Sequence, residues 1–430
     1  MRWPEPLHSA PDPDLDLAAR LFDSLRAQSF DGVGVTRDAY GAGEQRAHDL
    51  VRACAQDLDL PVRVDASGNL YVTLPGRDPA RPARMTGSHL DSVPAGGNFD
   101  GAAGVVAGLA VLAGWRAAGW RPAADVTVMA IRAEESTWFP YSYLGSKAAF
   151  GLVAPDALDL RRADTGRSLR DHLADLSIDP QRYGQPALRA AGIDRYVELH
   201  IEQGPTLVEA GLPAGIVTGI RGSFRYRDMA WHGEYAHSGA VGRAHRRDAV
   251  RAAALWMASL DRDWETLEDC GEDLVVTVGK VATDPAQHAF SKVAGELQCC
   301  VDVRSISATL LERFDRLLRE RGVAAARATG TRVDFGPRTG SAPAAMDPGL
   351  IARLTAQARQ RGIAALPMPS GAGHDAAIFA QQGIPTAMIF VRNEHGSHNP
   401  HEAMDMADFA CATQLLSDIL ADDQPVTPHP

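Results

Sequence analysis

Several features are scarce in this 430-residue chain, and each absence excludes a class of protein. No apolar run approaches the roughly 20 residues that cross a bilayer, so no membrane span is expected. Five cysteines, without a Cys-x-x-Cys pair, predict reduced thiols rather than a disulfide framework. A net charge of −11, without a basic stripe, argues against nucleic-acid binding. Residues 1–6 lack the apolar core of a signal peptide, so we expect a cytoplasmic protein.

The chain does contain apolar strands that alternate with helical periodicity. The continuous apolar strand at 126–131 is typical of a sheet covered on both faces. From residue 216 the pattern changes to β-α-β-β-α, which predicts a small inserted α+β domain. We therefore expect an α/β fold, with residues 1–215 and 331–430 in the main domain and residues 216–330 in the insertion.

One glycine-rich stretch, residues 87–104, concentrates side chains that bind metals. It contains His89, Asp91 and Asp100. Imidazole and carboxylate suit zinc, manganese or cobalt, and glycine lets the backbone bend tightly around an ion. A histidine in a turn, followed by a solvated Asp-Gly loop that binds no metal, would have the same sequence pattern. This stretch alone therefore leaves both interpretations open.

Further candidates lie at or beyond the ends of predicted strands. Glu134 and Glu135 follow the strand at 126–131, His200 is near the end of another, and His398 comes after a third. Adjacent carboxylates repel each other unless cations neutralise them. Chemistry in open α/β sheets gathers beyond the carboxyl ends of the strands. A solvated acidic turn and core histidines are the alternative interpretation.

Together the motifs resemble the M20 clan of dinuclear metallohydrolases. The amidase branch is the best match, namely the N-carbamoyl-L-amino-acid hydrolases, allantoate amidohydrolases and β-ureidopropionases. The resemblance covers about residues 30–415 and rests on motifs in family order: GSHLDSV, GGNFDG, Glu134-Glu135, ELHIEQGP, HSG followed by Arg246 and Asp248, DVR, SGAGHDA and SHNPHE. It implies a mixed-sheet αβα metallopeptidase-like catalytic domain, an inserted lid and dimerisation domain, and a homodimer.

The resemblance also implies two divalent metal ions per subunit, with Asp100 bridging them. The implied ligands are His89, Asp100, Glu135, His200 and His398. The same donor set serves zinc, manganese, cobalt or nickel, and zinc or manganese is the first expectation.

The remaining site residues are carried over from the same motifs. Glu134 would be the general base, and Asp91 would orient the His89 ring. In the insertion, His237 matches a histidine that reaches the partner subunit's active site. Arg304 matches the arginine that pairs with the substrate carboxylate, and Gln203 matches a substrate-contacting glutamine.

Three segments depart from the usual pattern of the family. Ser291 stands where carbamoylases have an asparagine that helps to bind the substrate carboxylate, so Ser291 or nearby His288 would replace it. Residues 136–139 (Ser-Thr-Trp-Phe) replace Gly-Ser-Arg-Phe, and residues 392–395 are more charged than usual. Because all three would read the substrate, its identity stays open.

The implied activity is hydrolysis of a C–N bond in an N-carbamoyl amino acid or related ureido acid, by a water that two metals activate. The partner is therefore a small carboxylate-bearing molecule, without nucleic acid or membrane. Hydrolysis of an N-acyl amino acid or dipeptide is the alternative within the clan. A catalytically inactive binding protein is the alternative from another class, and it is disfavoured because no ligand position is lost.

Overall fold

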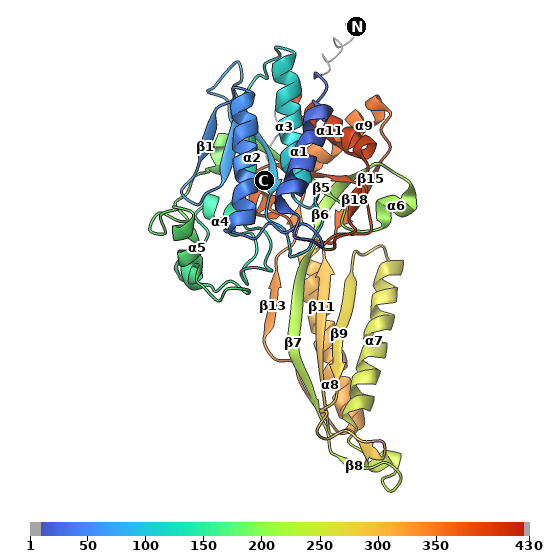
Figure 1. Ribbon diagram of the computed structural model, residues 1–430. Helices are drawn as coiled ribbons and strands as arrows, with labels where there is room; N and C mark the ends of the chain where they lie inside the picture. Colours follow the sequence, from blue (N-terminus) through green and yellow to red (C-terminus); the bar gives the residue numbers. More distant parts are fainter. Residues whose placement is uncertain (1–9, 425–430) are drawn as a thin grey trace, which may run out of the picture. The chain divides into compact units, whose positions relative to one another are not determined.

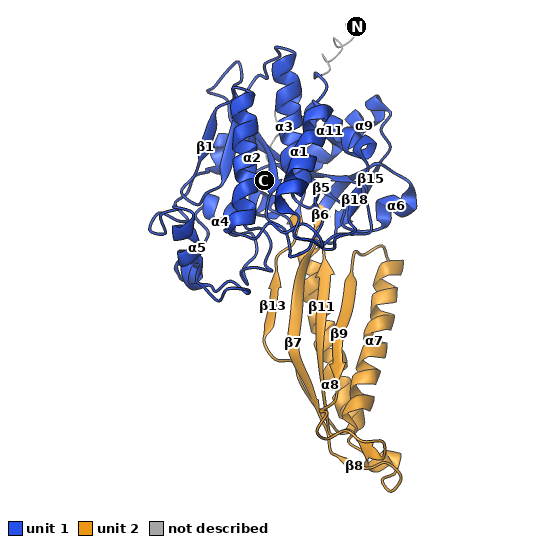
Figure 2. Cartoon of the chain, viewed as in Figure 1, with its two compact units in different colours: residues 1–218, 345–430 blue, residues 219–344 orange. Residues whose placement is uncertain are grey.

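The computed structural model describes residues 10–424 and divides into two compact units (Figures 1 and 2). Unit 1 comprises residues 1–218 and 345–430, and unit 2 comprises residues 219–344. Residues 1–6, on which the prediction of no signal peptide rests, lie outside the described residues. Within residues 10–424, no helix combines the length and the apolar character needed to span a bilayer. All five cysteines are free.

Most of unit 1 is organised on a nine-stranded mixed sheet. Its strands are β1 (Val62–Val64), β2 (Leu70–Leu74), β3 (Ala83–His89), β4 (Val126–Ile131), β5 (Ile193–Ile201), β6 (Ala214–Ile220), β14 (Ala344–Ala345), β15 (Ala365–Ser370) and β16 (Thr386–Val391). The order is β1-β2-β4-β3-β5-β16-β6-β14, and β15 also pairs with β6. Strands β4, β3, β5 and β16 run parallel, so their carboxyl ends lie along one edge of the sheet.

Helices cover both faces of this sheet. The helices of unit 1 are α1 (Leu15–Ser29), α2 (Ala42–Asp57), α3 (Ala102–Ala117), α4 (Leu144–Ala149), α5 (Leu169–Asp175), α6 (Thr206–Ala210), α9 (Pro348–Arg361), α10 (Ala376–Gln381) and α11 (Met406–Ala421). Val197 and Leu199 of β5 enter the core formed with α1, α3 and α11. Tyr196, which precedes Val197, faces the other way and stacks on Phe379 of α10, with ring centroids 3.6 Å apart. The predicted α/β class is confirmed.

Helix α3 approaches the sheet closely because its sequence is rich in small residues. A Cβ on Gly104 would lie 2.2 Å from the carbonyl oxygen of Leu199, and one on Gly108 would lie 2.8 Å from Val128. Alanine favours the helix, while these glycines permit the close contact. The helix starts at Ala102, two residues after Asp100, so this packing fixes one end of the loop that carries Asp100.

Unit 2 is a five-stranded antiparallel sheet with two helices. Its elements are β7 (Gly222–His232), β8 (Ala236–His237), α7 (Ala249–Asp269), β9 (Val275–Ala282), β10 (Lys292–Val293), β11 (Glu296–Ser305), α8 (Ala308–Thr329), β12 (Arg332–Asp334) and β13 (Arg338–Ser341). The order is β12-β7-β11-β9, and β13 also pairs with β7. Helices α7 and α8 pack on the sheet around Trp231, Trp256 and Phe314. Strands β8 and β10 form a separate two-stranded pair.

The boundaries of unit 2 differ from those expected for the insertion. The expected segment, 216–330, ends before β12 and β13, which pair with β7 and extend the unit to Ala344. All four residues of β13 are exposed, so this strand lacks the alternation of apolar and polar residues that sequence patterns detect.

Candidate metal centre

The carboxyl ends of the parallel strands bring the predicted ligands together. His89 is the last residue of β3, His200 is the last but one of β5, and Glu135 follows β4. His398 follows β16 after a short strand, β17 (Asn393–Glu394), which pairs with β18 (Ala403–Met404). Asp100 comes from the loop before α3. Together they form two groups that could each hold a cation.

The first group consists of His89, His200 and Asp100. His89 Nδ1 lies 3.0 Å from the carbonyl oxygen of Asp91, and His200 Nδ1 lies 2.9 Å from that of Ile201. A carbonyl oxygen only accepts, so each Nδ1 carries a hydrogen and the Nε2 of each neutral ring has none. The Nε2 of His200 also accepts the backbone amide of Gly101 at 3.2 Å. The two Nε2 atoms are 3.5 Å apart, and they lie 3.4 and 3.3 Å from Asp100 Oδ1. Three electron-rich atoms therefore converge on one point.

The surroundings of Asp100 favour a positive charge between its Oδ1 and the two imidazole rings. Its Oδ1 is buried and has no hydrogen-bond partner among the described residues. Burial would raise the pKa of Asp100, but its contacts with His200, His398 and His89 hold it well below the usual value. Burial would likewise lower the pKa of His89, but Asp100 and Asp91 raise it well above the usual value. Protons or a metal cation can supply this charge, and the donor types fit a divalent metal.

The second group consists of Asp100, Glu135 and His398. His398 Nε2 lies 3.3 Å from Asp100 Oδ2 and 3.0 Å from Glu135 Oε1. These two contacts raise the pKa of His398 to about 10. Asp100 thus offers Oδ1 to one group and Oδ2 to the other, which is the arrangement of a bridging carboxylate.

Comparison with known proteins agrees with this geometry. The model of "Peptidase family M20/M25/M40" matches residues 85–422. The chain belongs to this family. It is 34% identical to the N-carbamoyl-L-amino acid amidohydrolase of Geobacillus stearothermophilus, over 89% of this chain and 92% of the relative. It is 33% identical to the allantoate amidohydrolase of Escherichia coli, over 83% and 85% of the two chains.

A solved structure gives the same result for the fold of this M20 chain. An amidase of the hydantoinase/carbamoylase family from Burkholderia multivorans superposes with a TM-score of 0.87 at 26% identity, over 96% of this chain and 99% of that one. The resemblance inferred from the motifs is confirmed. So is the expectation of a hydrolase that acts on carbon–nitrogen bonds other than peptide bonds.

Glycine is required next to the shared carboxylate of the M20 centre. Gly101 has a φ of +67°, a region that side chains other than glycine rarely adopt. A Cβ there would lie 2.5 Å from the His89 ring. The Asp-Gly pair therefore turns the chain into α3 and leaves room for the imidazole.

Two carboxylates hold the backbone of the Glu134-Glu135 turn. The amides of Glu134 and Glu135 donate to Asp91 Oδ1 and Oδ2 at 3.0 and 3.1 Å. The preceding amide, that of Ala133, donates to Glu44 Oε1 at 2.8 Å, and Ala133 has a φ of +49°. Asp91 thus contacts His89 Nδ1 through its carbonyl oxygen at 3.0 Å and through Oδ1 at 3.3 Å, while both of its carboxylate oxygens hold this turn. Sequence reasoning missed Glu44, which lies in α2 without a motif of its own.

Glu134 is suited to carry a proton. Burial raises its pKa well above the usual value, and the negative charges of Glu135, Asp375 and Asp91 add to this effect, while His89 opposes it. A carboxyl group with a raised pKa can accept a proton in one step and release it in the next.

Gln203 contacts the carboxylate that the two candidate groups share. It has a φ of +65°, and its backbone amide donates to Asn393 Oδ1 at 2.9 Å. Its Nε2 donates to Asp100 Oδ2 at 2.8 Å. Its Oε1 is buried and has no hydrogen-bond donor within residues 10–424.

Residues 136–139, one of the three segments expected to contact the substrate, are only partly exposed. Ser136 and Thr137 are exposed, but Trp138 is buried and donates Nε1 to the carbonyl oxygen of Ser92 at 2.7 Å. Trp138 is therefore a packing residue.

The other predicted site residues lie in unit 2. Three of them, His237, His288 and Ser291, lie in or just before the paired strands β8 and β10. His237 in β8 pairs with Lys292 in β10, beside Ser291. His237 Nδ1 accepts the amides of Gly239 and Ala240, both at 3.1 Å, so its exposed Nε2 carries the hydrogen of the neutral ring. His288 is exposed, and its Nδ1 contacts Thr283 Oγ1 at 3.1 Å.

Arg304 lies far from His237 within unit 2. It is near the carboxyl end of β11, opposite Ser223, whereas β10 joins the other end of β11 through two residues. That separation is about 25 Å at roughly 3.3 Å per strand residue. Its guanidinium also contacts Asp302 at 3.2 and 3.1 Å. One small substrate therefore cannot contact both residues of the same unit.

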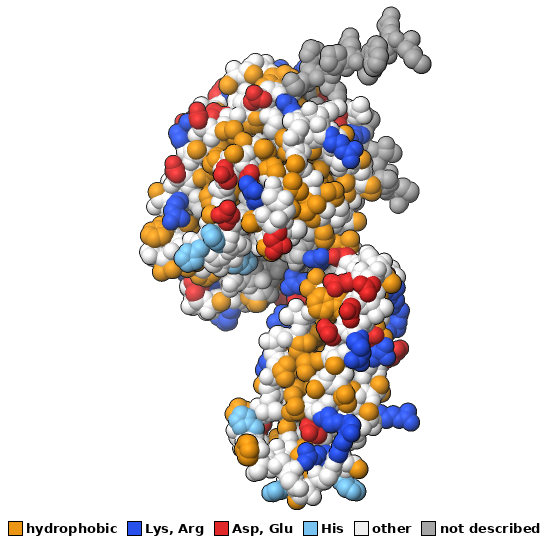
Figure 3. All heavy atoms as spheres, turned by 90° about the vertical axis from the view of Figure 1, so that its right-hand side faces the viewer, with side chains coloured by type: hydrophobic (Ala, Val, Ile, Leu, Met, Phe, Trp, Pro, Cys, Tyr) orange, Lys and Arg blue, Asp and Glu red, His pale blue; other side chains and the backbone are white. Residues whose placement is uncertain are grey.

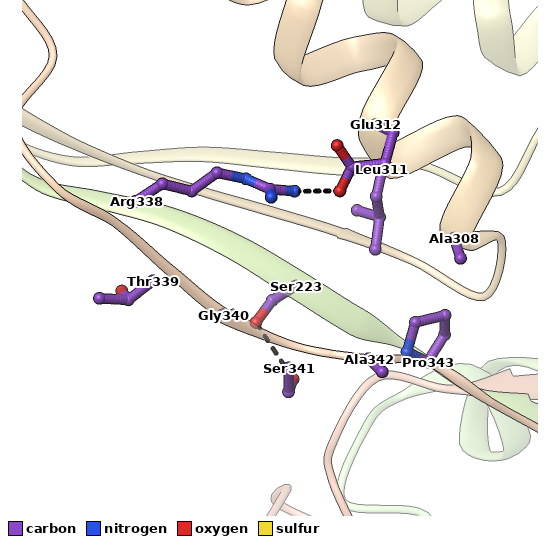
Figure 4. A pocket seen from close by; sticks show the side chains of 10 residues that line it. All are labelled: Ser223, Ala308, Leu311, Glu312, Arg338, Thr339, Gly340, Ser341, Ala342 and Pro343. Atoms are coloured by element: carbon purple, nitrogen blue, oxygen red, sulfur yellow. Dashed lines mark hydrogen bonds and ion pairs between the residues drawn. The ribbon is translucent and has the colours of Figure 1, made fainter. Parts of the chain in front are cut away.

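Unit 2 also contains a pocket of about 440 Å³ between β13 and the start of α8 (Figure 4). Figure 4 shows Arg338 extending toward Glu312, with an ion pair of 2.6 Å, and Ser223 facing Ser341. The charges in this lining are paired with each other, so the pocket has no excess charge with which to attract an ionic substrate.

Proposed function

We propose that this protein hydrolyses the ureido C–N bond of an N-carbamoyl amino acid or a related ureido acid. The observation that carries the proposal is the division of Asp100 between two metal-binding groups. Two relatives at 33–34% identity, named for N-carbamoyl-L-amino acid and allantoate, support the substrate class.

The residues present fit two divalent metal ions. His89, Asp100 and His200 would hold one, and Asp100, Glu135 and His398 the other, with zinc or manganese favoured by the imidazole and carboxylate donors. When bound, the ions would lower the pKa of a water molecule and polarise the carbonyl group under attack.

The proton steps belong to Glu134. Its carboxylate accepts a proton from the attacking water and returns it to the leaving nitrogen as the C–N bond breaks. An N-carbamoyl amino acid would release ammonia, and the remaining carbamate would decompose to the amino acid and carbon dioxide. The buried Oε1 of Gln203, which has no donor in the described structure, could accept an N–H of the ureido group.

Unit 2 supplies groups for the two ends of the substrate. The Nε2–H of His237 is suited to donate to the oxyanion that develops on the attacked carbonyl. The planar fork of Arg304 suits a carboxylate, and Ser291 or His288 would assist there. His237 lies in β8, which pairs with β10 just before the start of β11, whereas Arg304 lies near the end of β11. We therefore propose a homodimer in which the partner subunit's His237 completes each site.

The surface of unit 2 supports such a dimer. Leu255 of α7 and Val281 of β9 are 43% and 50% exposed. Figure 3 shows hydrophobic side chains between charged ones on the visible face of this unit. Among the described strands β9 pairs with β11 alone, which leaves one edge open to another chain.

Mixed dimers should reveal the shared site. Neither His237→Ala nor Glu134→Gln should be active alone. After mixing under conditions that exchange subunits, half of the dimers would be mixed and one of their two sites complete, so about a quarter of wild-type activity should return. A mixture of Glu134→Gln with Glu135→Gln is the control, because both changes damage the same catalytic unit. Recovery no greater than in the control would place His237 in its own chain's site.

A substrate panel tests the proposed function. Chelator-treated protein, reloaded with Zn, Mn, Co or Ni, would be given N-carbamoyl amino acids, allantoate, N-acetyl amino acids and dipeptides. We expect ammonia release from the ureido substrates and no turnover before reloading, because the activated water requires the metals. Turnover confined to the acyl or dipeptide substrates, without ammonia, would identify an N-acyl amino acid or dipeptide hydrolase instead.

A further inference from the structure

Glu402 lies directly behind the shared carboxylate, outside the proposed ligand set. It is buried, and its Oε1 accepts the backbone amides of Phe99 and Asp100 at 2.8 and 3.2 Å. Its Oε2 contacts the hydroxyl of Ser397 at 2.7 Å. One side chain therefore joins the loop of Asp100 to the segment that carries His398.

The same contacts hold Asp100 at two points. The Ser397 hydroxyl also contacts Asp100 Oδ2, so Glu402 reaches the carboxylate of Asp100 through Ser397 and its backbone directly. A carboxylate that serves two cations must keep both oxygens in fixed directions. Glu402 fixes these directions, because it binds the backbone amide of Asp100 directly and the Asp100 carboxylate through Ser397.

The surroundings of Glu402 are shaped to accept it. A Cβ on Gly97 would lie 2.1 Å from the carboxyl carbon of Glu402, so glycine provides its space. The buried Arg37 guanidinium donates to the carbonyl oxygens of Leu90 at 2.6 Å and Asp100 at 3.4 Å. Its charge partly offsets the buried carboxylates of this region.

We propose that Glu402 is a positioning residue that sets Asp100 and the His398 segment in the relation that two metal ions require. This inference rests on the proposed function. A glutamine can make every contact, because its Oε1 accepts the two amides and its Nε2 donates to Ser397, whose hydrogen then points to Asp100. An alanine makes none of them.

Cobalt binding to the metal-stripped protein tests this role. We expect Glu402→Ala to bind Co²⁺ about 10–100-fold more weakly, as on loss of an outer hydrogen-bonding partner, and to show an altered visible absorption spectrum. Glu402→Gln should stay within about 3-fold of the wild type and keep its spectrum, since its hydrogen bonds persist. Glu209→Gln, a change at an exposed glutamate of α6, is the control.

The outcomes separate positioning from a merely structural role. Glu402→Ala that melts earlier but binds Co²⁺ with wild-type affinity and spectrum would overturn the proposal, as would Glu402→Gln that is as defective as the alanine. If Glu402→Ala does not fold, Ser397→Ala takes its place, and it must weaken Co²⁺ binding while Glu402→Gln does not. Wild-type protein that binds Co²⁺ yet hydrolyses no ureido substrate would refute the proposed function and leave this comparison readable. Wild-type protein without Co²⁺ binding would overturn both.

Discussion

Glu134→Gln is expected to lower kcat by about 10²–10⁴-fold, the range of a general base, while the protein keeps its metal. Glutamine has the shape of glutamate but cannot take a proton from the attacking water. Neither metal-binding group includes Glu134, so the substitution leaves all the proposed ligands in place. Its backbone amide still donates to Asp91, so the turn is preserved.

Steady-state kinetics and metal analysis together check this expectation. KM should change little, because substrate binding does not use the proton. The wild-type rate should fall as pH falls and Glu134 becomes protonated, whereas the variant should lose this acid limb. Activity above about a tenth of the wild-type kcat would exclude Glu134 as the base, because a loss that small lies below the range for such a group.

The adjacent glutamate offers a matched control. Glu135→Gln is an equally small change one residue away, but Glu135 Oε1 lies 3.0 Å from His398 Nε2 in the second metal-binding group. This variant should lose metal affinity, whereas Glu134→Gln should lose turnover alone. The opposite pattern would exchange the roles assigned to the two residues.

The sheet, and the gathering of the candidate ligands at one of its edges, could be predicted because their signals are local. Apolar strands such as β4 are visible as continuous runs, and polar residues directly after strands mark the reactive edge. One contact was missed although its signal is also local. Residues two apart on a strand share a face, so the sequence could have placed Asp302 beside Arg304.

The anchoring carboxylates could not be predicted in the same way. Glu402 binds the amide of Phe99 across 303 residues, and Glu44 binds that of Ala133 across 89. Every residue except proline has a backbone amide, so the sequence does not indicate which amide a distant glutamate binds. The distance between His237 and Arg304 likewise depends on how β8 pairs with β10 and β7 with β11, and periodicity does not define these registers.

Asp100→Ala is expected to remove both metal ions. Asp100 is the member that the two groups share, so its loss leaves His89 and His200 in one and Glu135 and His398 in the other. Two protein ligands hold a divalent ion poorly against chelator. We expect affinity to fall by more than the 10–100-fold typical of losing an outer partner, and activity to fall below detection.

Metal content per chain, measured after dialysis against a weak chelator, distinguishes a bridge from an ordinary ligand. His89→Ala and His398→Ala should each lose one ion, because each histidine belongs to one group. Glu209→Gln is the control, since this exposed glutamate of α6 lies outside both groups. Asp100→Ala that still holds one ion would mean that one group binds without it. In that case the carboxylate would serve a single ion, the one that is lost, and the single-histidine variants would show to which group that ion belongs.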